Sequence, residues 1–100
     1  MDFQIFNSSL NQDVPHIGLP PLLKALWYDE KGDWNKAHDI ADGMPGLDAA
    51  WVHAYLHRKE GVQWNANYWY RRASKASPNK SLKTEWEEIV RYLLAKNINA

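Results

Sequence analysis

Three histidines have a spacing that suits a metal site. His53 and His57 lie four residues apart, so on a helix both side chains project from the same face. A zinc site needs three or four protein ligands, and His38, Asp39 and Asp42 lie close enough along the chain to complete one. There is no His-Glu-x-x-His motif. We expect the two neighbouring histidines to be half-buried and hydrogen-bonded, with a metal-binding or enzymatic His cluster as the alternative.

A second group of residues combines aromatic and cationic side chains. A helix is predicted over residues 62–77, and one side of it carries Trp64, Tyr68, Arg71, Arg72 and Lys75. Such a surface can stack bases and contact phosphates, or hold an acidic segment of a partner. We favour packing of its two rings under the last predicted helix, against Trp86, with the arginines in cation–π contact. Single-stranded nucleic-acid binding is a further alternative.

Other catalytic chemistry has no support in the sequence. The absence of Cys excludes disulfides, thiolate metal ligands and cysteine nucleophiles. The serines and Thr84 have the positions of loop or cap residues, and no phosphate-binding glycine loop is present. We therefore expect a non-enzymatic protein without a cofactor.

The composition is that of one small globular domain. With 100 residues, 45% of them hydrophobic, the chain has the commonest size of a single domain. Six Trp and five Tyr supply a large buried area, so one core can form without disulfides. The N-terminal residues lack a basic residue before Lys24 and a long apolar run, which predicts a cytoplasmic protein without a membrane partner.

The two halves of the chain carry opposite charge. Residues 1–50 hold three basic and eight acidic side chains, whereas residues 51–100 hold nine basic and four acidic ones. We interpret this division as attraction between neighbouring repeats across a shared interface, or as charges solvated on separate faces. A basic surface for an anionic partner is the alternative.

The hydrophobic pattern predicts five helices after an irregular arm over residues 1–18. They are expected over residues 19–31, 33–44, 48–60, 62–77 and 80–97. Asp33 and Asp48 are the predicted N-caps of the second and third helices, and Pro78 ends the fourth. The apolar residues from Leu82 to Leu94 form one stripe on the last helix.

A short motif occurs twice. Residues 32–37 (GDWNKA) and 61–66 (GVQWNA) align at a distance of 29 residues, and each motif joins two predicted helices. The Gly permits a tight left-handed turn, and the Ala at the end of the motif permits close helix packing. The result is an all-α fold of two tandem antiparallel hairpins, over residues 19–45 and 47–78.

The second hairpin resembles a tetratricopeptide repeat through Ala54, Ala66, Tyr70, Ala73 and Pro78. In the first hairpin, Ala25, Tyr28 and Ala37 fit the pattern, so the resemblance covers residues 19–78. Ala50, His53 and His57 depart from it, because the family usually has Trp, Leu and Tyr there. Residues 51–73 also resemble small bacterial proteins, which implies no activity.

The resemblance implies a tetratricopeptide-like superhelix closed by a capping helix over residues 80–97. The N-terminal arm would cover the other end, anchored by Phe3, Ile5 and Phe6. The first helix of each hairpin would line a groove, with Leu23, Trp27 and Glu30 from one and Trp51, Tyr55, Arg58 and Lys59 from the other.

The leading prediction is a protein-interaction or self-association module that binds a short peptide or another copy of the chain. A protein partner is favoured over nucleic acid. Hot spots of protein binding are rich in Trp, Tyr and Arg. The candidate partner-binding residues are therefore Trp27, Trp51, Tyr55, Arg58, Lys59, Trp64, Tyr68, Arg71 and Arg72.

Overall fold

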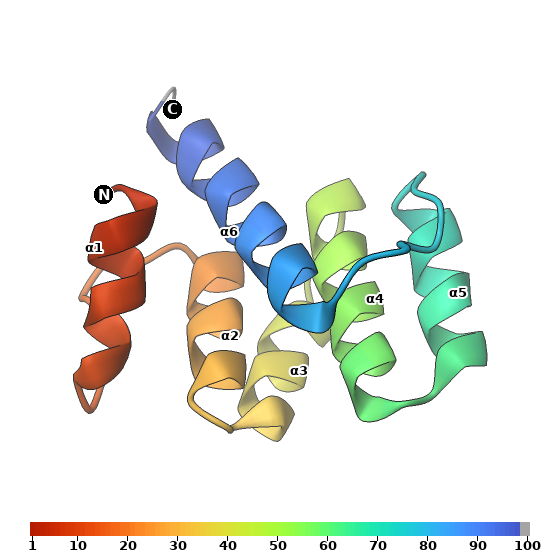
Figure 1. Cartoon of the computed structure of the whole chain (residues 1–100), viewed down its shortest axis with the longest axis horizontal. Helices are drawn as coiled ribbons and strands as arrows, with labels where there is room; N and C mark the ends of the chain where they lie inside the picture. The colour runs from red at the N-terminus through yellow and green to blue at the C-terminus, as the bar shows by residue number, and fades with distance from the viewer. Residues whose placement is uncertain (99–100) are drawn as a thin grey trace.

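The computed structural model describes residues 1–98, and within this range the chain is all-α, as predicted (Figure 1). Its elements are α1 (Phe3–Ser8), a short 3-10 helix η1 (Ser9–Asn11), α2 (Pro21–Glu30), α3 (Trp34–Asp42), α4 (Leu47–Glu60), α5 (Gln63–Arg72) and α6 (Leu82–Ile98). None of the described helices is both long and apolar enough to span a membrane.

Local signals set most helix ends. Pro21 opens α2, where a missing N–H has no cost, and the Asp33 carboxylate accepts the Lys36 N–H at the start of α3. Gly32 and Gly61, the first residues of the repeated motif, both have left-handed backbone angles (φ 95° and 92°). These two turns therefore require glycine for the reason that the sequence indicates.

Two predicted helix ends are wrong. The N-cap of α4 is Gly46, and Asp48 lies in the first turn of the helix, where its carboxylate accepts hydrogen bonds from Tyr92 and Lys96 of α6. Helix α5 ends at Arg72, five residues before the predicted end. Ser74 adopts a left-handed conformation there (φ 59°), and the Lys75 N–H bonds back to the Tyr70 carbonyl oxygen at 2.9 Å. This left-handed turn, and not Pro78, therefore ends the helix.

Consecutive helices pack in pairs, α2 against α3 and α4 against α5, and α3 joins the pairs by packing against α4. Small residues at the contacts allow this close approach: Ala25, Ala37, Ala54 and Ala66 are all fully buried. The core continues through the large side chains of Trp27, Leu26, Tyr55 and Leu56.

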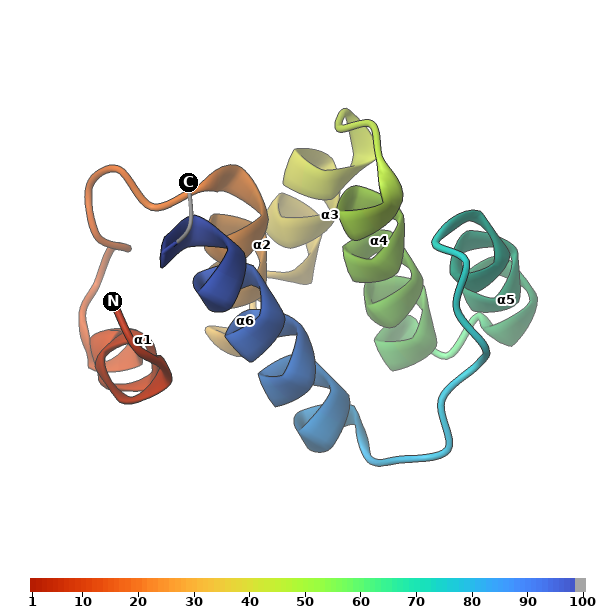
Figure 2. The same ribbon diagram turned by 90° about the horizontal axis from the view of Figure 1, so that it is seen from above.

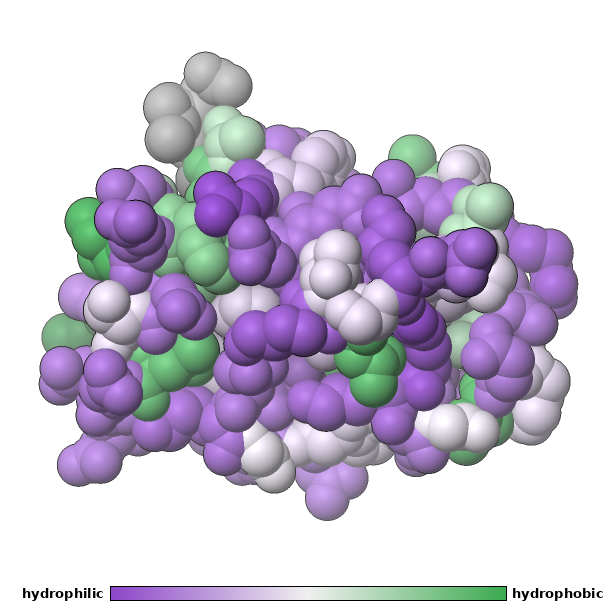
Figure 3. Space-filling view, in the orientation of Figure 1, coloured by the Kyte–Doolittle hydropathy of each residue, from purple (hydrophilic) through white to green (hydrophobic). Residues whose placement is uncertain are grey.

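Helix α6 runs obliquely across α2 and α4 (Figures 1 and 2). It does not stack on α5, so it differs from the capping helix that the sequence predicts. Its stripe of Trp86, Ile89, Val90 and Leu93 is buried against α2 and α4, and Trp86 Nε1 donates to the Leu26 carbonyl oxygen at 3.1 Å. The face that carries α6 is mainly hydrophilic, with apolar side chains in small separate groups (Figure 3).

The first part of the N-terminal arm is helical (α1 and η1), contrary to the prediction of an irregular segment, whereas residues 12–18 are irregular as predicted. Asp2 caps α1 by accepting the Ile5 N–H at 2.9 Å. Phe3 and Phe6 are three residues apart, so they share a helical face, and both ring centroids lie 6.0 Å from the Trp86 ring. Ile5 is on the other face with 51% of its surface exposed, so it is not an anchor.

Candidate metal centre

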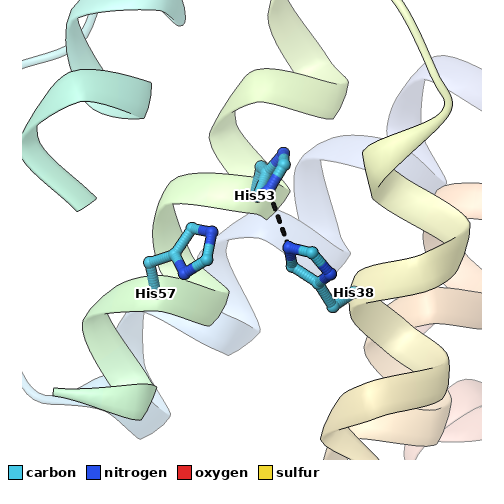
Figure 4. Close-up of side chains that lie close together, drawn as sticks. All are labelled: His38, His53 and His57. Atoms are coloured by element: carbon cyan, nitrogen blue, oxygen red, sulfur yellow. Dashed lines mark hydrogen bonds between the residues drawn. The ribbon is translucent and has the colours of Figure 1, made fainter. Parts of the chain in front are cut away.

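Three histidines converge between α3 and α4 (Figure 4). Each offers one ring nitrogen that lies within 4.8 Å of those of the other two. The Nε2 atoms of His38 and His53 are 3.0 Å apart and share a hydrogen bond. His53 and His57 are buried, and His38 is half-buried at the edge of the cluster. The prediction that His53 and His57 are hydrogen-bonded is thus confirmed, and they are more deeply buried than expected.

The packing of α3 on α4 brings these side chains together. Trp34, the first residue of α3, donates its indole N–H to the Leu56 carbonyl oxygen of α4 at 2.8 Å. The same indole stacks on the His38 ring, with centroids 4.9 Å apart and planes 12° apart. Trp34 therefore fixes both the distance between the helices and the direction of the His38 ring.

Helix α5 supplies a second indole that packs against the histidines, Trp69. The Trp69 ring stacks on His53, with centroids 3.9 Å apart and planes at 17°. His53 and His57, one turn apart on α4, stack on each other with centroids 4.8 Å apart. The two indoles thus hold the imidazoles from opposite helices, and a cluster fixed in this way binds an ion with little reorganisation.

Burial keeps the central imidazole neutral. Burial, and after it the nearby His38 and His57, lower the pKa of His53 to about 4, while the Asp42 carboxylate acts in the opposite direction. At neutral pH His53 therefore has one ring nitrogen with a free lone pair. A neutral imidazole is the form that binds metal ions.

Two carboxylates flank the cluster. Glu60 Oε1 lies 3.0 Å from His57 Nδ1, and Asp42 Oδ1 lies 3.8 Å from His53 Nε2. A carboxylate that accepts the Nδ1 proton of a histidine leaves Nε2 with its lone pair, as in many zinc sites. Asp42 is a predicted ligand, whereas Asp39 is exposed on α3 and lies outside the cluster.

The sequence analysis missed the role of Glu60 and of the two indoles. Glu60 lies three residues after His57 on α4, a spacing that places the two side chains on one helical face. That spacing is a usable signal. Trp34 lies four residues before His38 on α3, so the same helical spacing signals their contact. Nothing in the spacing of Trp69 indicates that its ring meets His53 of a different helix.

The spacing of the nitrogens suits a tetrahedral ion. With Zn–N distances of about 2.0–2.1 Å, the ligand nitrogens of tetrahedral zinc lie about 3.3 Å apart. The pair from His38 and His53 is already near this distance at 3.0 Å. The His57 nitrogen lies within 4.8 Å of the other two, so its ring must move closer, away from its contacts with Glu60 and Asn65, to share the ion. Imidazole ligands suit Zn²⁺, Cu²⁺ and Ni²⁺, and the chain has no Cys that would compete for softer ions.

The predicted groove is filled by the chain itself. Trp27, Trp51 and Tyr55 are almost completely buried. Arg58 forms an ion pair with the buried Glu85 of α6, and Lys59 forms one with the buried Asp29 of α2. These five candidate partner-binding residues therefore make intramolecular contacts in this structure.

The other four candidates lie on α5 and are exposed. Trp64 has 75% and Tyr68 42% of its surface accessible, and Arg71 and Arg72 are exposed beside them. The prediction that these rings pack against Trp86 is wrong, because α6 crosses α2 and α4 instead of covering α5. The predicted cation–π contact is present at Arg72, whose guanidinium lies 5.7 Å from the Tyr68 ring.

Comparison of the chain with protein-family models, with curated proteins and with solved structures found no match. The function is therefore inferred from the residues and their geometry alone.

Proposed function

We propose that the chain binds one divalent transition-metal ion, Zn²⁺ in the first place, through His38, His53 and His57. The observation that carries the proposal is the convergence of one ring nitrogen from each histidine to within 4.8 Å, from two different helices. The fourth His of the chain, His16, is exposed in the segment between η1 and α2. It provides an internal comparison for a histidine outside the cluster.

The exposed carboxylate of Asp42 is the nearest candidate for a fourth ligand, and water is the other. Asp42 lies at the C-terminal end of α3, and its side chain needs only a small movement from its 3.8 Å contact with His53. Bound in this way, the ion links α3 to α4 and so fixes one helix pair against the other. Binding would then stabilise the folded chain, since the unfolded chain does not hold the three imidazoles together.

Calorimetric titration of metal-free protein with Zn²⁺ tests the proposal. We expect one ion per chain and a stabilisation of about 2.7 kcal/mol when free Zn²⁺ is one hundred times its Kd. Co²⁺ in place of Zn²⁺ should give the visible absorption of a four-coordinate ion. Absence of both heat and any change in melting temperature would contradict the proposal.

Variants separate the site from adventitious binding. His38→Ala removes a half-buried ligand and should abolish stoichiometric binding, whereas His16→Ala should leave it unchanged. Glu60→Gln keeps the fold, because Glu60 is exposed, but should weaken binding about 10–100-fold through His57. Equal Zn²⁺ affinity of the His38 and His16 variants would place the ion elsewhere.

The tetratricopeptide resemblance, the role as an interaction module and the cytoplasmic location stay predictions from the sequence. What supports an interaction role is the exposed aromatic and cationic surface on α5. A peptide in the groove between α2 and α4 would first have to displace α6.

A further inference from the structure

The outer face of α5 has an unusual composition. Its exposed or half-exposed side chains are aromatic rings, amides and guanidinium groups: Gln63, Trp64, Asn67, Tyr68, Arg71 and Arg72. Residues 61–84, which include α5 and the connection to α6, contain five basic residues and no acidic one. Of these five, Arg71 and Arg72 lie on this face, whereas Lys75, Lys80 and Lys83 contact Trp51, Glu88 and Glu30.

The Trp64 ring is open to solvent. Its exposure is 75%, and among the described residues no aromatic ring or cation lies against it. Tyr68, one turn further along, is held in place: its ring meets Trp69 edge-on at 5.3 Å, and Arg72 donates to its hydroxyl at 3.1 Å. One ring is thus free for stacking, and the next is oriented by its neighbours.

The surroundings of these rings favour a nucleic acid over a protein. The centre of a protein interface is apolar and excludes water around its Trp or Arg hot spots. On the outer face of α5 the neighbours are Gln63, Asn67 and the two arginines, and no aliphatic side chain is present. Amides can hydrogen-bond to base edges and arginines to phosphates, while bases stack on aromatic faces.

The spacing of the two rings favours a single strand. Trp64 and Tyr68 are four residues apart, which is about 6 Å along a helix axis. Successive bases in a stacked strand are about 3.4 Å apart, so two rings at this distance suit bases that have left the stack. A duplex would keep its base faces covered.

From these observations we infer that the outer face of α5 binds single-stranded nucleic acid, with a base on Trp64 and phosphates at Arg71 and Arg72. The residues of this face are not those that contact the histidine cluster, which α5 reaches through Trp69 and Asn65. The proposed nucleic-acid contacts and the metal ligands are therefore different residues, and Trp69 lies between them.

Fluorescence anisotropy of a labelled 12-nucleotide oligo-dT, and of oligo-U of the same length, tests the inference. We expect binding at low salt that weakens as salt rises, with a log–log slope of about −1.4 for two phosphate contacts. A blunt duplex of the same length should bind at least ten times more weakly. Equal affinity for the duplex would overturn the single-strand proposal.

Variants assign the binding to α5. Trp64→Ala should weaken it about 5- to 150-fold, the range for loss of one stacked base, and Trp64→Phe should restore part of the affinity. The double variant Arg71→Gln/Arg72→Gln should reduce the salt slope. Arg91→Gln, which changes an exposed arginine of α6, is the control and should behave as the unchanged protein.

A 12-residue oligoglutamate peptide tests the alternative that this face binds an acidic protein segment instead of a nucleic acid. We expect no binding that depends on Trp64, because a carboxylate chain offers no ring to stack. Competition by the peptide at the concentration at which oligo-dT competes would overturn the inference in favour of an acidic protein segment. An unchanged affinity of Trp64→Ala, in protein with an unchanged circular dichroism spectrum, would also overturn it.

Discussion

The carboxylate of Glu85 is buried at the first turn of α6 and accepts hydrogen bonds from side chains of α4 and α5. Arg58 donates at 2.9 Å, Tyr70 at 2.6 Å and Trp51 at 3.2 Å. Burial, followed by the hydrogen bond to Glu85, raises the pKa of Tyr70, so its hydroxyl stays a donor. A buried charge with this many partners holds the start of α6 in one position.

Removal of this carboxylate should be costly. Glu85→Ala leaves the Arg58 guanidinium half-buried without its carboxylate, and we expect a loss of about 3–5 kcal/mol in the free energy of unfolding. Glu88→Ala, one turn further on α6, removes an exposed pair with Lys80 and should cost about 0–1 kcal/mol. Urea denaturation of both variants gives the comparison. Similar losses for the two would show that the Glu85 hydrogen bonds contribute little.

Asp29 is a second buried carboxylate, on α2, with a less complete set of partners. Lys59 Nζ lies 3.1 Å from its Oδ1, but among the described residues neither oxygen has a hydrogen bond of regular geometry. Burial raises the pKa of Asp29 above its ordinary value of 3.8, and Lys59 counteracts part of this rise. The folded protein therefore binds this proton more tightly than the unfolded chain does.

The sign of the pKa shift gives a pH-dependent prediction. In Lys59→Met the charged Asp29 has no counter-ion, and we expect a loss of about 1–3 kcal/mol in the free energy of unfolding at pH 7. Because protonation relieves the buried charge, the loss should shrink as the pH falls towards the raised pKa of Asp29. Urea denaturation of the variant and of the unchanged protein at pH 7 and pH 4.5 measures this loss in the free energy of unfolding.

Lys83→Met is the matched control for this pair. It removes an ion pair with the more exposed Glu30, so the expected cost is about 0–1 kcal/mol with little change between the two pH values. A Lys59→Met loss that is the same at both pH values would contradict the assignment to Asp29.

Among the helices, α6 has the position that decides whether the groove between α2 and α4 is open to a peptide. It is held at its start by Glu85, along its length by the Trp86 stripe, and near its end by Lys96, whose ammonium pairs with Asp48 of α4 at 2.5 Å. A helix held at both ends occupies the surface that a groove-binding peptide would need. Because the peptide would have to displace α6, competition with α6 would weaken the binding of any such peptide.

The contact of α1 with α6 should contribute to stability. Phe6 is fully buried, and the change Phe6→Ala should cost about 3–5 kcal/mol through lost burial and a cavity beside Trp86. Ile5→Ala, on the exposed face of the same helix, should change stability by less than about 1 kcal/mol. Thermal unfolding compares them, and deletion of residues 1–15 should likewise lower Tm. Equal Tm values for both substitutions would show that α1 is not docked.

In the molecule as a whole, the opposite charges of the two halves meet. The ion pairs Lys59–Asp29, Lys83–Glu30 and Lys96–Asp48 each join a basic residue of the second half to an acidic residue of the first. Of these pairs, only Lys59–Asp29 joins the two hairpins, as the expected attraction between repeats would; the other two pairs join α6 to the hairpins. Arg71 and Arg72 have no part in these pairs, which is consistent with a separate role for the end of the molecule at α5.

The arrangement of the helices explains why one end of the molecule is covered and the other is exposed. In both ribbon views, α1 and α5 lie at opposite ends of the molecule (Figures 1 and 2). Helix α1 contacts α6 through Phe3 and Phe6, whereas the outer face of α5 keeps Trp64 exposed. Because α6 lies over α2 and α4, it shields the middle of the array and leaves the α5 end open.

The sequence by itself determined the five helices that follow the N-terminal arm and most of the apolar residues that form their core. Apolar periodicity identified the stripe of α6, and the glycines of the repeated motif marked the turns before α3 and α5, because both signals depend on backbone geometry within a few residues. It also indicated that His53 and His57 share one face of α4, since that depends only on the helical repeat.

Only the tertiary structure decided which surfaces meet. An apolar stripe specifies that a helix must be covered but not by which partner, so the path of α6, the docking of α1 and the burial of Glu85 could not be read from the sequence. The convergence of His38 on His53 depends on how Trp34 seats α3 against α4. The exposure of Trp64 depends in turn on α6 lying elsewhere. Helical periodicity is local, whereas these contacts join residues far apart in the chain.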